Sequence, residues 1–141
     1  YQYTWVEHIA SISAIQTILP SDNVLISYLE QRITSSTITI CRAKLTYGGK
    51  YRVTCELRRS GYSYNSMVRI YRDKISDVNM VGVVMSNSET YVPVSVDLEA
   101  IPPNSELIFV LRSENSNTNA WVRSLKICGK LGFLDNELII S

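Results

Sequence analysis

Apolar and polar residues alternate with a period of two along most of the chain between residues 37 and 129. In the segment 51–58, which reads YRVTCELR, the odd-numbered positions are apolar and the even-numbered positions are polar. Such alternation is typical of a half-buried antiparallel strand. Turn-forming residues recur at short intervals, and together the patterns predict strands at 37–47, 51–58, 66–72, 78–85, 90–98, 106–112 and 120–128.

Three irregularities in this pattern carry predictions of their own. The apolar phase switches between Ile40 and Cys41, which indicates a β-bulge. Pro93 cannot donate a ladder hydrogen bond, so its strand is expected to lie at a sheet edge or to carry a bulge. The segment 106–112 is apolar between its charged ends, as in a strand that is buried on both faces.

No helical pattern separates these strands, so the sequence predicts an all-β fold, an antiparallel jelly-roll-like β-sandwich. The segments 8–19 and 24–33 fit either a helix or a strand, and their Ser, Ile and Thr residues favour strands. The length of 141 residues is that of a single domain.

The two ends of the chain are expected to serve in assembly. Residues 1–23 would form an N-terminal arm, and residues 131–141 would form an apolar C-terminal tail that adds a strand or contacts a neighbouring subunit. The residues expected to make these contacts are Tyr1, Tyr3, Trp5, Phe133, Leu134, Leu138, Ile139 and Ile140.

The charge balance argues against a nucleic-acid partner. The chain has 14 Lys and Arg residues against 13 Asp and Glu residues, whereas nucleic-acid binding needs a basic surplus on one face. A local basic cluster of Arg58, Arg59, Arg69 and Arg72 spans a predicted hairpin, and we interpret it as a solvated tip or a contact between subunits. No stretch approaches the roughly 18 apolar residues of a membrane-spanning helix, so no membrane partner is expected.

The residues indicate no catalytic centre. His8 is the single histidine, which excludes schemes that need two, and no nucleophile motif surrounds it. The acidic residues lie beside predicted turns, where solvated charges are expected, so a glycosidase pair is not favoured. We therefore expect a protein that is not an enzyme and that uses no cofactor.

Metal and redox sites are not indicated either. The spacing of Cys41, Cys55 and Cys128 matches no zinc or redox motif, so we expect three small buried apolar residues. A calcium ion at the turn between Asp73 and Asp77 is conceivable, but a solvated turn is the favoured interpretation.

Four stretches carry a family resemblance: YGGKYRVTCEL at 47–57, VRIYRD at 68–73, IPPNSELIF at 101–109 and AWVRSLKICG at 120–129. In this order they resemble motifs of the jelly-roll modules in tail, appendage and decoration proteins of tailed bacteriophages and prophages. The chain departs from those motifs at Asn104-Ser105, where Gly-Asp is usual, and at Ser124, where Asn is usual.

The resemblance implies a non-enzymatic structural protein of a phage virion, in the tail, the baseplate or the capsid surface. It implies two kinds of partner, namely further copies of the chain in a homo-oligomer, with a trimer favoured, and other virion proteins. It also implies synthesis in the cytoplasm of the bacterial host and a final location in the extracellular particle. The family shares no catalytic residues that could be transferred to this chain.

The alternative is a carbohydrate-binding module of a host-receptor-binding protein, with a cell-surface glycan as its partner. Its candidate contacts are Tyr62, Tyr64 and Asn65, because tyrosine rings stack on sugars and Asn supplies hydrogen bonds. Local packing of these tyrosines is the competing interpretation, and Trp121 is expected to pack in or beside the core. A secreted jelly roll of the C1q or TNF type is a third interpretation, which the odd number of cysteines disfavours.

Overall fold

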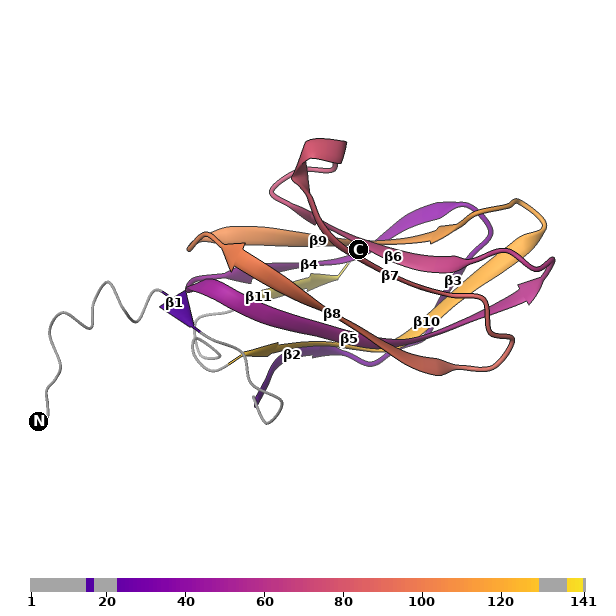
Figure 1. Ribbon diagram of the computed structural model, residues 1–141, viewed down its shortest axis with the longest axis horizontal. Helices are drawn as coiled ribbons and strands as arrows, with labels where there is room; N and C mark the ends of the chain where they lie inside the picture. Colours follow the sequence, from indigo (N-terminus) through magenta and orange to yellow (C-terminus); the bar gives the residue numbers. More distant parts are fainter. Residues whose placement is uncertain (1–14, 17–22, 130–136, 141) are drawn as a thin grey trace, which may run out of the picture.

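The computed structural model describes residues 15–16, 23–129 and 137–140 and arranges them in two facing β-sheets (Figure 1). Sheet A has β5 and β10 at its centre and consists of β1 (Ile15–Gln16), β2 (Asn23–Tyr28), β3 (Arg32–Thr34), β5 (Gly48–Gly61), β8 (Val92–Ile101) and β10 (Thr118–Gly129). Sheet B consists of β11 (Glu137–Ile140), β4 (Thr37–Leu45), β9 (Ser105–Ser113), β6 (Ser66–Arg72) and β7 (Met80–Ser86), in that spatial order. A short 3₁₀ turn, η1 (Asp77–Asn79), precedes β7. No helix in these ranges is long and apolar enough to cross a membrane.

The antiparallel jelly-roll-like sandwich predicted from the sequence is confirmed. Each described strand pairing is antiparallel except that of β1 with the start of β5. The chain crosses between the layers from β4 to β5 and again from β5 to β6. The expected hairpin between 51–58 and 66–72 is therefore wrong, because β5 pairs with β8 and β10 while β6 pairs with β7 and β9.

The irregularities of the sequence pattern all have structural counterparts. The register between β4 and β9 shifts between Thr39 and Cys41, and this bulge turns both Ile40 and Cys41 into the core. In sheet A, β8 pairs with β5 alone, so the strand of Pro93 lies at an edge. Ile108 and Val110 of the central strand β9 are buried on the outer face of sheet B. These three predictions are confirmed.

Several strand boundaries differ from the expectation, and two of the differences affect the topology. The segment 24–33 forms two short strands, β2 and β3, which both pair with β10. Gly48 begins β5, three residues before the start of the strand predicted at 51–58. A Cβ atom at Gly48 would lie 2.7 Å from the carbonyl oxygen of Ile101. The end of β8 therefore approaches the backbone so closely that a glycine is needed there.

The C-terminal tail contributes the edge strand β11, which pairs with β4. Leu138, Ile139 and Ile140 lie in this strand, so the added strand expected in the tail is present. The remaining residues expected in assembly, together with the single histidine, lie outside the described ranges: Tyr1, Tyr3, Trp5, His8, Phe133 and Leu134. The assembly role of both ends stays a prediction.

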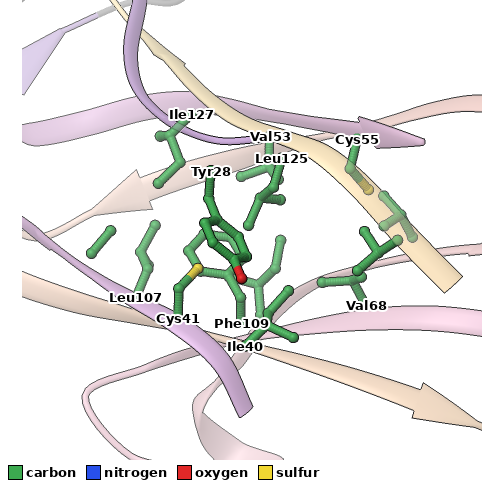
Figure 2. Close-up of a cluster of buried hydrophobic side chains, with 14 of the residues drawn as sticks. Tyr28, Ile40, Cys41, Val53, Cys55, Val68, Leu107, Phe109, Leu125 and Ile127 are labelled. Carbon is green, nitrogen blue, oxygen red and sulfur yellow. The ribbon is translucent and has the colours of Figure 1, made fainter. Parts of the chain in front are cut away.

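The core lies between the sheets and is filled from both (Figure 2). Val53 and Ile127 extend from sheet A, and Leu107 and Phe109 face them from sheet B. All four are essentially inaccessible to solvent. Burial of this apolar surface is the main force that holds the two layers together.

The prediction that the cysteines are buried is confirmed for two of the three and is wrong for Cys128, which alternates with the core residue Ile127. Cys41 and Cys55 are buried, whereas Cys128 is partly exposed. Burial raises the pKa of the Cys41 thiol to about 12, although the positive charge of Arg32 opposes the rise. Burial also raises the pKa of the Cys55 thiol to about 12, and the negative charge of Glu56 adds to the effect.

The free energy of unfolding is expected to fall as the pH rises above 9. Unfolded thiols ionise near their ordinary pKa of 9.0, whereas the folded thiols stay protonated up to about pH 12. Between pH 8 and pH 10 each thiol should lower the free energy of unfolding by about 1.4 kcal/mol. Urea unfolding at both pH values measures this, with the double variant Cys41→Ala/Cys55→Ala as the control. An equal pH dependence in both proteins would contradict the burial of the thiols.

Candidate functional site

A row of side chains crosses three neighbouring strands on the outer face of sheet A. Arg58 of β5 pairs with Trp121 of β10, and Trp121 pairs in turn with Ile33 of β3. The adjacent positions Leu57 and Val122 are core residues. Because successive side chains of a strand point to opposite faces, the row must face away from the core. Trp121 therefore lies on the outer surface of the sheet and not within the core.

Tyr91 reaches this row from one edge of the sheet. It lies just before β8, and its hydroxyl donates a hydrogen bond of 2.6 Å to Oε1 of Gln31, which lies just before β3. The strands β8 and β3 flank the central pair β5 and β10 on opposite sides. The Tyr91 side chain and Gln31 thus bridge the two central strands on the outer face.

Two arginines lie against the aromatic rings. The guanidinium carbon of Arg58 is 4.1 Å from the centroid of the Trp121 ring and 5.7 Å from that of Tyr91. The guanidinium carbon of Arg123 is 3.9 Å from the centroid of the Tyr91 ring. All three distances are within the range of cation–π attraction, which ends at about 6 Å. We call these four residues, Arg58, Tyr91, Trp121 and Arg123, the aromatic–arginine array.

Hydrogen bonds hold the array in place. Nε of Arg123 donates to Oε1 of Glu56 at 2.6 Å, across the β5–β10 ladder. Nε1 of Trp121 donates to Oγ of Ser60 at 2.9 Å, also on β5. Three members of the array stand on the two central strands of the sheet, so its geometry is set by a rigid scaffold.

The hydroxyl of Tyr91 stays protonated at neutral pH. Burial raises its pKa above the ordinary value, although the positive charges of Arg123 and Arg58 oppose the rise. The hydroxyl therefore remains a donor to Gln31, and the bridge across the sheet is kept throughout the physiological pH range.

A groove of about 230 Å³ adjoins the array on the same face, and its lining includes Glu56, the hydrogen-bond partner of Arg123. The register between β10 and β5 shifts between Arg123 and Lys126, so the groove lies at a β-bulge. Ser124, within the bulge, has a left-handed backbone with φ of 57°. Bulges commonly redirect side chains next to functional sites. The lining residues are Thr54, Cys55, Glu56, Pro93, Ser124 and Lys126.

The predicted glycan contacts lie at the tip that follows β5. Tyr62 and Tyr64 are exposed by 61% and 45% of their surface. The backbone N–H of Asn65 donates to Oε1 of Glu114 at 2.7 Å, and Oγ1 of Thr118 donates to the Tyr62 carbonyl oxygen at 2.7 Å. The tip is thus joined to the turn between β9 and β10, and β5 connects it to the array through Ser60.

The basic cluster expected from the sequence does not form one patch. Arg58 faces outward from sheet A, whereas Arg69 alternates with the core residues Val68 and Ile70 and faces outward from sheet B. The side chain of Arg59 is mostly covered and donates to Asn87. The prediction of a common cluster is wrong because β5 and β6 belong to different sheets.

A larger hollow of about 310 Å³ lies elsewhere, where β4 and β9 meet the turn after β6. Its lining residues are Lys44, Leu45, Thr46, Asp73, Asn104, Ser105 and Glu106. Aromatic rings, the usual stacking surfaces for flat ligands, are lacking in this set. Oδ1 of Asp73 accepts a hydrogen bond from the Glu106 backbone N–H at 3.0 Å, so one of the polar groups that line the hollow is already engaged within the fold. The smaller groove beside the array is therefore the better candidate site.

Comparison with known proteins supports the fold. No protein-family model matches the chain, and no curated protein matches it in sequence. Among solved structures, the CBM36-1 domain of a multidomain xylanase from the hindgut metagenome of Trinervitermes trinervoides is similar, with a TM-score of 0.57. The two share 12% identity over 79% of this chain and 93% of that chain. At this identity the likeness establishes a shared jelly-roll β-sandwich.

Two further structures show the same fold. Carbohydrate-binding module CBM36 in complex with calcium and xylotriose has a TM-score of 0.54 and 9% identity, over 76% of this chain and 93% of that chain. The module CBM6cm-2 from Cellvibrio mixtus lichenase 5A in complex with cellotriose has a TM-score of 0.51 and 8% identity. That match covers 75% of this chain and 98% of the module. In the described part of this chain, no three His, Cys, Asp or Glu side chains are grouped to hold a metal ion.

The aromatic–arginine array was not predicted from the sequence, although the phase of the alternation carried a signal for it. In the segment AWVR at 120–123, Ala120 and Val122 share one phase of the alternation, and Trp121 shares the other with Arg123. A tryptophan in the polar phase of a strand indicates an aromatic side chain on the outer face. The same signal extends to Tyr91, which shares the polar phase with Ser95 and Asp97 in the strand predicted at 90–98, although β8 begins only at Val92. Its neighbours in space depend on the strand order, which the alternation does not show.

Proposed function

We propose that this chain is a carbohydrate-binding module and that the outer face of sheet A is its binding surface. The observation that carries the proposal is the pair of rings, Tyr91 and Trp121, held beside a polar groove on an otherwise rigid sheet. Aromatic rings supply apolar contact area for the C–H faces of sugars, and a few polar groups fix the orientation of the ligand. The sandwich fold, which this chain shares with carbohydrate-binding modules, supports the same proposal.

The groove offers suitable partners for sugar hydroxyls. Hydroxyl groups of Thr54 and Ser124, the carboxylate of Glu56 and the ammonium group of Lys126 all line it. These side chains include both donors and acceptors, as sugar hydroxyls require. We assign binding and not catalysis to this face, since the one carboxylate in the groove lining, Glu56, already accepts from Arg123.

Removing both rings is expected to abolish most of the glycan binding. The purified chain is tested on a glycan array and then by calorimetry, with xylotriose and cellotriose among the first probes. These sugars are bound in two of the similar structures. Truncation of buried aromatic anchors commonly costs 2 kcal/mol or more, so Tyr91→Ala/Trp121→Ala should bind at least about tenfold more weakly.

The matched control is Tyr62→Ala/Tyr64→Ala, which removes two exposed rings at the tip of the same chain. We expect this variant to bind almost as well as the unmodified chain. The opposite result would move the site to the tip that the sequence indicated. Absence of binding to every glycan on the array would refute the proposed function.

The phage setting implied by the motif resemblance stays a prediction. The same holds for a homo-oligomer, for other virion proteins as partners and for a location in the virion. A host cell-surface glycan as ligand is compatible with both the binding proposal and the virion setting.

A further inference from the structure

We propose that the glycan recognised by the aromatic–arginine array is acidic, and that the guanidinium of Arg58 receives its carboxylate. This inference rests on the proposed function and adds the chemical class of the ligand. It is carried by three properties of Arg58. Among the described residues its charge has no carboxylate partner and its N–H donors have no acceptor, and its position is set by two rings.

The charges on the outer face of sheet A are incompletely balanced. Three ion pairs lie there, namely Lys50–Glu99 at 3.4 Å, Arg52–Asp97 at 2.7 Å and Arg123–Glu56 at 2.6 Å. Arg58 and Lys126 stand on the same face, and within the described ranges neither forms an ion pair with a carboxylate. The face therefore keeps a positive surplus, which attracts an anionic ligand.

In the described part of the chain, no acceptor takes up the guanidinium N–H donors of Arg58. A guanidinium has five N–H donors. Those of Arg123 and Arg52 are directed to the carboxylates of Glu56 and Asp97, and those of Arg59 to Asn87, Gly61 and Glu89. The described contacts of the Arg58 guanidinium are with the faces of the Trp121 and Tyr91 rings. A guanidinium stacked by its face leaves its N–H edge free for another partner.

A carboxylate fits this edge better than a neutral hydroxyl does. Carboxylate and guanidinium are both planar, and they form two parallel charge-assisted hydrogen bonds. Because the rings already restrain Arg58, little side-chain freedom remains to be lost on binding. The same guanidinium covers part of the Trp121 surface, which reduces the area left for stacking of a neutral sugar.

Lys126 extends the positive surplus to the far end of the groove. It opposes Thr54, which lies four residues before Arg58 along β5. At 3.3 Å per residue this places the backbone positions of the two cations about 13 Å apart along the strand. Arg58 is assigned the carboxylate, because its guanidinium is restrained by the two rings. An acidic oligosaccharide along the groove would also approach Lys126.

The test compares each acidic sugar with its own neutral form. Calorimetry at low salt uses trigalacturonate, a glucuronic-acid-substituted xylo-oligosaccharide and sialyllactose, each beside its methyl ester. The ester keeps the sugar ring and removes the charge. Loss of a bidentate charge-assisted contact predicts that at least one acid binds about 10- to 100-fold more tightly than its ester.

Three variants assign the preference to Arg58. In Arg58→Gln the acid and the ester should bind equally, and in Arg58→Lys a part of the preference should remain because the charge is kept without the planar fork. Arg112→Gln, on the central strand of the opposite sheet, should change nothing. Urea unfolding of all three variants excludes a folding defect as the cause.

The outcomes separate the two proposals. Equal binding of acid and ester by the unmodified chain overturns the acidic ligand and leaves a neutral carbohydrate-binding module. An acid preference that survives in Arg58→Gln overturns the role of Arg58. If neither the acids, nor the esters, nor xylotriose and cellotriose bind, the proposed function itself fails.

Discussion

Replacing Phe109 with alanine is expected to lower the free energy of unfolding by about 3–5 kcal/mol. Phe109 is completely buried in the centre of the core, on the central strand of sheet B (Figure 2). Its neighbours across the ladder, Cys41 and Ile70, are held by their own hydrogen-bonded strands. They cannot collapse fully into the space that the ring leaves, so the loss of burial and the cavity both contribute. A domain is typically stable by only about 5–15 kcal/mol, so this loss is large.

Urea unfolding followed by circular dichroism measures the effect. The slope of the unfolding free energy against urea concentration should stay unchanged, which indicates that the folded and unfolded states are as compact as before. The matched control is Tyr62→Ala, which removes an aromatic ring that is 61% exposed. Substitutions at such surface positions usually change stability by about 0.5 kcal/mol or less. If the two variants were equally stable, the inward direction of Phe109, and with it the register of β9, would be wrong.

The strands could be predicted because burial on one face imposes a period of two on the residues themselves. The phase switch at Ile40 and Cys41 even located the bulge, because a single extra residue exchanges the two faces of a strand. The segment 24–33 was harder. Both of its strands, β2 and β3, pair with β10, and residues 29–31 between them do not form part of a strand. This interruption depends on the partner strand, and the alternation along the chain does not show it.

The candidate site could not be predicted in the same way, since it depends on which strands are neighbours. Arg58, Tyr91 and Trp121 come from three distant segments and meet because β5 lies between β8 and β10. Proximity in the sequence predicted that Arg58 and Arg69 belong to one cluster. The chain crosses from sheet A to sheet B between them, so the two side chains lie on opposite outer faces of the sandwich. The direction of a side chain follows from the strand pattern, whereas its partner follows from the topology.

Replacing Gly61 with valine is expected to cost about 3 kcal/mol of unfolding free energy and to weaken glycan binding. Gly61 ends β5 with φ of 88°, a left-handed conformation that a β-branched residue adopts at a cost of about 1–2 kcal/mol. A Cβ atom there would also contact the carbonyl oxygen of Asn117 more closely than real Cβ atoms do. Relief of such overpacking by backbone shifts costs a further 1–3 kcal/mol, approximately.

The loss of binding is expected because the backbone must move next to the array. Gly61 follows Ser60, whose hydroxyl accepts the indole N–H of Trp121 at 2.9 Å. Gly61→Asn separates the conformational cost from the steric cost. Asparagine tolerates a left-handed backbone but still carries a Cβ atom, so this variant should regain only the conformational part of the lost unfolding free energy. Asn119→Val, at the neighbouring exposed position of β10, is the control for a β-branched residue and should be nearly neutral. Full recovery of stability in Gly61→Asn would show that the contact with Asn117 does not restrict this position, and the approach of the β9–β10 turn to the end of β5 would have to be revised.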